Sequence, residues 1–125
     1  MRIERITDAA VVRRAADLFD GPPLPEATEK FLAAPAITSC WPYACDRAVG
    51  MISGVEMTHP DKGTEMFVYE LGVAPHARLR GVGTALVRAL ADIARERGCY
   101  GMWVGTEHDN EAVQRTYRRA GANGY

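Results

Sequence analysis

The sequence predicts one mixed α/β domain whose sheet is partly antiparallel. Its length of 125 residues suits a single hydrophobic core. Apolar residues recur at three-to-four spacing over residues 82–97, which indicates an amphipathic helix. Apolar strand-like runs lie on both sides of this helix, at residues 64–75 and 100–106. Such a strand–helix–strand unit is expected to be right-handed with parallel strands.

Before this unit, the chain predicts one strand and two helices. Residues 2–7 ("RIERIT") read as a strand. A helix then runs from a cap at Thr7 or Asp8 to a stop at Gly21. After the break at "PPLP", a second short helix covers "EATEKFLAA" and ends before Pro35.

Two further strands are predicted in the middle of the chain, at residues 36–45 and 48–57, as a hairpin around Asp46-Arg47. Pro42 inside the first strand indicates an edge position or a bulge. Residues 58–63 ("THPDKG") are expected to form a loop. The strand at 64–75 is apolar on both faces, which predicts a strand in the middle of the sheet with both faces buried.

The chain ends in one more predicted helix, over residues 109–121, capped by Asp109 or Asn110. The element order is therefore β-α-α-β-β-β-α-β-α. No internal repeat or low-complexity tract interrupts it, so residues 1–125 are expected to form one domain.

Composition and charge limit the possible functions. The first twenty residues carry charges throughout and lack the apolar segment of a signal peptide, and no apolar run reaches membrane-spanning length. Three cysteines without a C-x-x-C pair predict a reducing, cytoplasmic setting. The three histidines are scattered singly, which does not favour a metal site. The formal net charge of -1, with no basic stripe interleaved with aromatic residues, does not favour nucleic acid.

The charges are nevertheless unevenly placed. Residues 46–70 carry five acidic and two basic side chains, whereas residues 78–119 carry eight arginines and five acidic side chains. The acidic part suits a cationic ligand and the basic part a phosphorylated one. A solvated surface of mixed charge is the simpler alternative.

The segment "ARLRGVGTAL" lies at the start of the long predicted helix. Gly81 and Gly83 permit positive φ and a close backbone approach. Free N–H groups and the helix dipole favour an anion there, and phosphate is the natural candidate. The segment lacks the lysine of a Walker A loop, and Leu86 stands where a dinucleotide fingerprint needs a third glycine.

The segment instead resembles motif A of the GNAT superfamily of acetyl-CoA-dependent N-acetyltransferases. The pattern Arg/Gln-x-x-Gly-x-Gly/Ala is matched from Arg78 to Gly83, and the preceding V-x-P by Val73-Ala74-Pro75. Residues 110–121 ("NEAVQRTYRRAG") resemble the family's motif B. More narrowly, "FVYELGV" and the acidic segment after Trp103 are similar to the aminoglycoside 3-N-acetyltransferase branch.

The resemblance implies a coenzyme A site. The diphosphate would be bound along the motif A loop, and the pantetheine arm would pair with the main chain of the preceding strand. The implied cofactor residues are Leu71, Gly72, Val73, Arg78, Leu79, Arg80, Gly81, Val82, Gly83, Thr84, Asn110 and Tyr117. For each of the two arginines, the alternative is an ordinary surface charge.

Two catalytic residues are expected. Glu70 is the candidate base, because a carboxylate in an otherwise apolar strand is costly unless it is used or paired. A structural hydrogen bond is the alternative. Tyr117 matches the motif B tyrosine that protonates the departing thiolate, although its spacing from Val113 alone would place it in the core.

The acceptor is expected to be a primary amine on a small polycationic molecule, an aminoglycoside above all, with antibiotic resistance as the role. Its candidate ligands are Glu56, Glu65, Glu107 and Asp109. The alternatives are a polyamine, a protein or peptide amine, or a coenzyme A-binding module without catalysis. Relatives ordinarily continue with further strands after motif B, so we expect a fold lacking them and a homodimer that covers the exposed edge.

Overall fold

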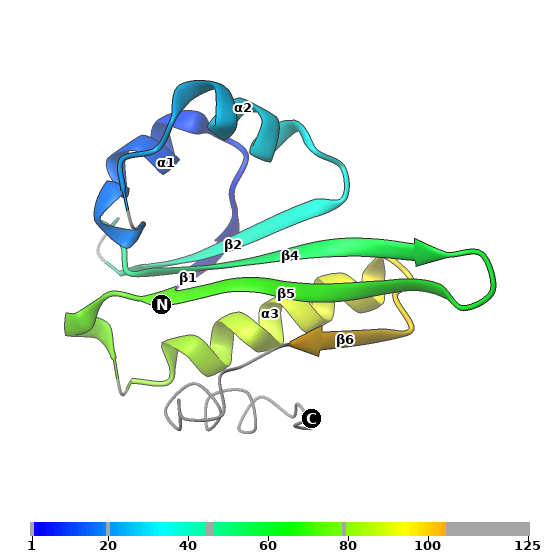
Figure 1. Cartoon of the computed structure of the whole chain (residues 1–125). Helices are drawn as coiled ribbons and strands as arrows, with labels where there is room; N and C mark the ends of the chain where they lie inside the picture. Colours follow the sequence, from blue (N-terminus) through cyan, green and yellow to red (C-terminus); the bar gives the residue numbers. More distant parts are fainter. Residues whose placement is uncertain (1, 20, 45–46, 79, 105–125) are drawn as a thin grey trace.

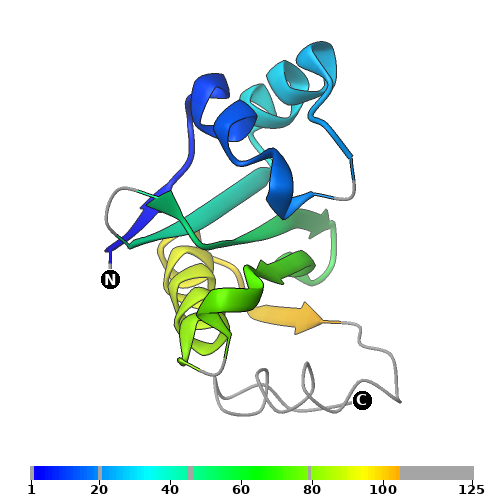
Figure 2. The same ribbon diagram turned by 90° about the vertical axis from the view of Figure 1, so that its left-hand side faces the viewer.

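The computed structural model describes residues 2–19, 21–44, 47–78 and 80–104. In this part, a six-stranded sheet has the order β1-β2-β4-β5-β6, with β3 paired to β2. Helices lie on both of its faces (Figures 1 and 2). The strands are β1 Arg2–Arg5, β2 Ile37–Ala44, β3 Arg47–Ala48, β4 Gly50–His59, β5 Gly63–Val73 and β6 Gly101–Val104. The helices are α1 Ala9–Arg14, α2 Pro25–Ala33 and α3 Val82–Glu96.

The first predicted helix is shorter than expected. Asp8 caps α1, since its Oδ1 accepts a hydrogen bond from the Ala10 N–H at 2.8 Å. The α-helix ends at Arg14, however, and a 3-10 turn covers Ala16–Leu18. A 3-10 turn has three residues per turn, which keeps Ala15 and Leu18 in line toward the core. The prediction of α2 is confirmed, with Pro25 at its first turn.

Pro42 does not lie at the edge of the sheet, because β2 runs between β1 and β4. The proline lies where the β2–β4 pairing stops and the short β3 takes over, between the pairs Cys40–Ile52 and Tyr43–Ala48. Its missing N–H is therefore not needed in a continuous ladder. The edge prediction is wrong, and the alternative prediction, a bulge, is compatible with this change of partner strand.

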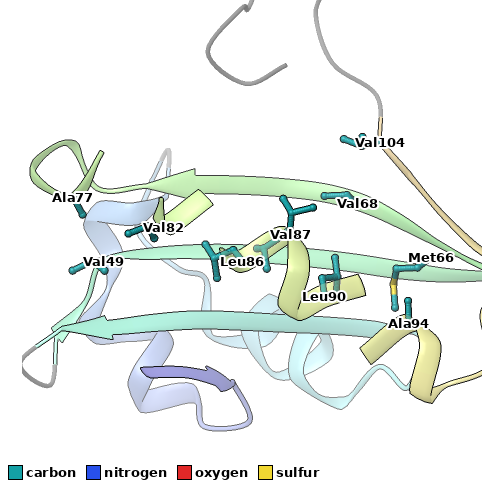
Figure 3. Close-up of a cluster of buried hydrophobic side chains, with 11 residues drawn as sticks. Val49, Met66, Val68, Ala77, Val82, Leu86, Val87, Leu90, Ala94 and Val104 are labelled. Atoms are coloured by element: carbon teal, nitrogen blue, oxygen red, sulfur yellow. The ribbon is translucent and has the colours of Figure 1, made fainter. Parts of the chain in front are cut away.

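The larger core lies between α3 and one face of the sheet (Figure 3). From α3, Val82, Leu86 and Leu90 are buried, as the three-to-four spacing predicts. Gly54 on β4 lets the helix approach closely, since a Cβ there would lie 3.0 Å from a Leu90 methyl carbon. The α3 helix ends at Arg97 as its C-cap, and Gly98 follows at φ +78°, as predicted for a helix stop.

The smaller core lies on the opposite face, where α1 and α2 cover one end of the sheet (Figure 2). Its centre is Trp41, which is fully buried and donates from Nε1 to Ser39 Oγ at 2.8 Å. These helices leave the outer part of β5 open. Phe67, Tyr69 and Glu70 are exposed on this strand. The prediction that both faces of the 64–75 strand are buried is therefore wrong, although its central place in the sheet is confirmed.

The two strands of the strand–helix–strand unit are parallel, as predicted. Strands β5 and β6 are parallel, with Glu65–Gly101 and Val68–Val104 as the end pairs. The turn before β5 is tighter than the expected loop, because β4 continues to His59 and β5 begins at Gly63. The predicted helix over residues 109–121 lies outside the described residues.

Candidate active site

The N-terminus of α3 offers several backbone donors. Gly81, the N-cap, has φ +78° and is exposed, and no side chain of the described residues caps the helix. The first helical bond runs from the Ala85 N–H to the Gly81 carbonyl. The N–H groups of Val82, Gly83 and Thr84 thus have no intrahelical acceptor. With no acidic residue in the first turn, this end of the helix favours an anion.

The two glycines of this loop differ in their roles. Gly81 has the positive φ that the sequence predicted, but Gly83 lies inside the helix and is not among the glycines with positive φ. The lack of a side chain at Gly83 therefore affects only how closely a ligand can approach the helix end.

Two cations flank this helix end. Arg78 and Arg80 are both exposed, and Arg78 Nε donates to the Val73 carbonyl at 3.2 Å. Arg78 is thereby held beside the end of β5, with its terminal guanidinium nitrogens still available. Leu79, between them, lies outside the described residues.

Strand β5 has a free edge next to this loop. Strand β6 pairs with residues 65–68 of β5, and no described strand pairs with the same edge from Tyr69 onward. The Ala74 N–H bonds to the Val49 carbonyl, so Ala74 faces β4. By alternation, the backbone groups of Leu71 and Val73 face the free edge. An extended ligand can pair with this edge as an additional strand would.

Gly72 does not fit the predicted main-chain pairing. Its carbonyl points toward β4, where it lies 2.7 Å from the position of a Cβ on Gly50. A Cβ on Gly72 would face the side of α1, where the Leu18 carbonyl oxygen, at 4.0 Å, is the one neighbour within 4 Å among the described residues. Gly72 thus keeps that face of β5 open rather than binding through its backbone.

A β-bulge orients Glu70. The register between β4 and β5 shifts at Ser53/Gly54, which leaves one extra residue in β5. Val68 and Leu71 both pack on the side of α3, so the two residues between them, Tyr69 and Glu70, both project from the opposite face. Glu70 is exposed and has no hydrogen bond or ion pair to the described residues.

This exposure corrects the reasoning for Glu70. The Glu70 carboxylate is not buried at a cost in the strand, because water reaches it. The role of Glu70 as the candidate base is supported instead by its position beside the free edge of β5. The exposed Tyr69 is not predicted by a strand that is buried on both faces. The consecutive run "FVYEL", which breaks strict alternation, was the available signal.

The structure does not bring Glu56 and Glu65 together. Glu56 lies on the α3 face, where Arg97 Nε donates to its Oε2 at 2.6 Å. Glu65 lies on the opposite face, where it accepts from the Tyr100 hydroxyl at 2.6 Å and contacts His59 Nε2 at 3.2 Å. The expected convergence of acceptor carboxylates is therefore not found for this pair.

The hydrogen bond from Tyr100 is the main reason that the pKa of Glu65 is lowered, with a further contribution from His59. The same bond raises the pKa of Tyr100. The remaining predicted residues, Glu107, Asp109, Asn110 and Tyr117, lie outside the described residues.

In the described ranges, no helix has the combination of length and apolar character needed to cross a bilayer. Among the same residues, no group of three or more His, Cys, Asp or Glu side chains is placed to hold a metal ion.

Known acetyltransferases resemble this chain in sequence. A family model described as "Acetyltransferase (GNAT) family" matches residues 10–122. The streptothricin acetyltransferase of Streptomyces lavendulae is 39% identical over 54 residues, which are 43% of this chain and 29% of that protein. N-alpha-acetyltransferase 30 of Schizosaccharomyces pombe is 29% identical over 76 residues, 61% of this chain and 51% of that protein. The matches thus span about half or less of the length of these curated relatives.

Solved structures share the fold. An aminoglycoside acetyltransferase from an uncultured soil metagenomic sample has a TM-score of 0.87 at 18% identity, covering 99% of this chain and 92% of that one. The enzyme AAC(6')-Iy, in complex with a bisubstrate analog of CoA and acetylneamine, has a TM-score of 0.84 at 21% identity, covering 98% and 90%. The narrower resemblance to aminoglycoside 3-N-acetyltransferases stays a prediction. With the family model matching residues 10–122, the chain belongs to the acetyltransferase (GNAT) family.

Proposed function

We propose that the chain transfers an acetyl group from acetyl-CoA to a primary amine of a small polycationic acceptor, with aminoglycosides as the acceptor class. One observation carries the proposal: the uncapped N-terminus of α3 lies directly after the free edge of β5 in the chain. A ligand with a diphosphate and an amide-containing arm matches these two features together. The solved relatives that were crystallised with CoA or an aminoglycoside support the same assignment.

The described residues fit coenzyme A. The N–H groups of Val82, Gly83 and Thr84 would hold the diphosphate, and Arg78 and Arg80 would add positive charge. The backbone of Leu71 and Val73 would pair with the pantetheine arm. When bound, acetyl-CoA supplies an acetyl group activated as a thioester.

Glu70 would act as the base. It removes a proton from the acceptor ammonium, directly or through a water molecule, so that the nitrogen lone pair is free to form the new C–N bond. The C–S bond breaks as the C–N bond forms, the nitrogen loses its second proton, and the departing thiolate gains one. We assign this exchange to the Tyr117 hydroxyl as a prediction from motif B: it would protonate the thiolate and be reprotonated from the nitrogen, directly or through water. A main-chain N–H near Leu71 would stabilise negative charge on the acetyl oxygen.

Thiol release from acetyl-CoA, measured over a panel of amines, tests the proposal. We expect turnover with sisomicin and little with a peptide amine. A preference for peptides would favour the alternative that N-alpha-acetyltransferase 30 suggests. Coenzyme A binding without turnover of any amine would indicate a binding module instead.

Glu70→Gln tests the base. The variant keeps the size of the side chain but cannot take a proton, and we expect kcat/KM to fall by about 10²-fold or more at neutral pH. Coenzyme A affinity, measured by calorimetry, should stay unchanged. Glu29→Gln, an equally exposed change on α2, serves as the matched control and should have wild-type activity. Wild-type kcat/KM in Glu70→Gln would exclude this residue as the base.

A further inference from the structure

An aromatic surface remains exposed on the face of the sheet opposite α3. Phe67 on β5 and Trp103 on β6 are register partners in the parallel pair, with 43% and 39% of their surface exposed. Their neighbours Met66 and Met102 pack into the core on the α3 side, so these two rings project from the other face. We refer to Phe67 and Trp103 as the aromatic shelf.

The indole of Trp103 is held in place. A Cβ added to Gly101 would lie 3.6 Å from Trp103 Nε1, so the indole lies back over this glycine. The register partner of Gly101 is Glu65, and Trp103 is one of the side chains that lower the pKa of the Glu65 carboxylate. Tyr100 and His59 hold the same carboxylate at 2.6 and 3.2 Å. Glu65 is thus a positioning residue for the shelf.

The shelf lies beside the site of the proposed reaction. The β5–β6 pairing that carries it ends at Val68–Val104, and the bulge with Tyr69 and Glu70 follows immediately. Phe67 and Glu70 are three residues apart on one face, a span of roughly 10 Å. An acceptor molecule that contacts both the aromatic shelf and Glu70 must therefore be long enough to span this distance.

The chemistry of this surface favours one class of acceptor molecule. Aromatic faces attract cations and also stack on apolar ring faces. Two carboxylates of β5 on this face, Glu65 and Glu70, add negative charge. A saturated ring with an apolar CH face and ammonium substituents satisfies all three features, whereas a linear polyamine has no ring face to stack.

We infer that the aromatic shelf binds a non-reacting amino-substituted ring of the acceptor while another amine of the same molecule meets Glu70. This inference rests on the proposed function and makes Trp103 a specificity-determining residue. It predicts that cyclic polycations are better acceptors than linear ones of similar charge.

Tryptophan fluorescence tests binding without requiring turnover. The chain has two tryptophans, and Trp41 is fully buried, so acrylamide quenching reports mainly on Trp103. Sisomicin should reduce the quenching, and spermidine at the same concentration should not. In Trp103→Phe, where Trp41 alone remains, sisomicin should leave the quenching unchanged.

Steady-state kinetics test specificity. In Trp103→Ala, the KM for sisomicin should rise about tenfold, as expected for a lost ring–cation contact, with kcat nearly unchanged. Trp103→Phe should recover most of this loss. Glu65→Ala should raise the same KM and increase the quenching of Trp103 in the free protein, and Glu65→Gln should do so less, because its amide oxygen can still accept from Tyr100.

The outcomes separate this inference from the proposed function. Sisomicin turnover with no protection of Trp103 and an unchanged KM in Trp103→Ala would overturn the shelf and leave the function intact. Equal protection by spermidine would also overturn it. If no amine is acetylated, the proposed function fails. The quenching experiment still tests ring binding at the aromatic shelf: protection of Trp103 by sisomicin supports it, and the absence of protection overturns it.

Discussion

An acidic residue in the first turn of α3 should affect stability and coenzyme A binding in opposite directions. Thr84 is the third helical residue, half-buried, and its N–H is among the unpaired donors. In Thr84→Glu, the carboxylate interacts favourably with the helix dipole, which contributes about 0.3–1 kcal/mol. For a domain of this size, the melting temperature should rise by roughly 1–4 °C.

The same carboxylate should repel the diphosphate. Two unit charges about 5 Å apart, at an effective dielectric constant of about 20, repel by about 3 kcal/mol, or roughly a hundredfold in affinity. Salt should reduce this difference. Misfolding cannot cause weaker binding together with higher stability, so the combination identifies the site.

Calorimetric titration with coenzyme A and thermal unfolding of the free protein are the two assays, each at low and high salt. Thr84→Gln is the matched control, since it has the same length without the charge. Wild-type affinity in Thr84→Glu would refute a diphosphate at this helix end. A lower melting temperature would show that the end of α3 is not an uncapped terminus.

Three further changes test the fold. In Gly54→Ala, the new Cβ would lie 2.7 Å from a methionine sulfur of β5 and 3.0 Å from a leucine methyl carbon of α3, so the variant should lose about 1–3 kcal/mol of stability in urea unfolding. Gly21→Ala is the control, because its Cβ would have no described atom within 4 Å, and this variant should keep the wild-type stability. Thr38 is buried and its hydroxyl has no hydrogen-bond partner among the described residues, so Thr38→Val should stabilise by about 1 kcal/mol; destabilisation would mean that the hydroxyl is satisfied. Tyr100→Phe should be less stable than the wild type between about pH 4.5 and pH 10. The lowered pKa of Glu65 makes the contribution of this bond disappear as pH falls below 4.5, and the raised pKa of Tyr100 makes it disappear above 10.0; a pH-independent difference in melting temperature would contradict this assignment.

Local signals predicted much of the fold. The cap at Asp8, the buried stripe of α3 and the stop at Gly98 follow from short-range spacing and from residue types with one strong preference. The positive φ of Gly81 at the start of α3 could be predicted for the same reason, because glycine adopts this conformation without strain.

The arrangement of side chains on the sheet faces could not be predicted in this way. Whether the outer face of β5 is covered depends on where α1 and α2 lie, and nothing within residues 64–75 encodes that. The bulge shifts the register by one residue, which places the side chains of Tyr69 and Glu70 on the same face of the sheet. Glu56 and Glu65 are similar in sequence terms, but they lie on opposite faces because each occupies a different phase of its strand.

The most direct measurement of the central claim is amide chemical-shift mapping with coenzyme A. If the diphosphate binds at the start of α3, the largest shifts should be those of the N–H groups of Val82, Gly83 and Thr84, followed by Leu71 and Val73 on the free edge of β5. Unchanged chemical shifts of these five amides, together with shifts elsewhere in the protein, would contradict this binding site. The absence of any amide shift at saturating coenzyme A would contradict it as well.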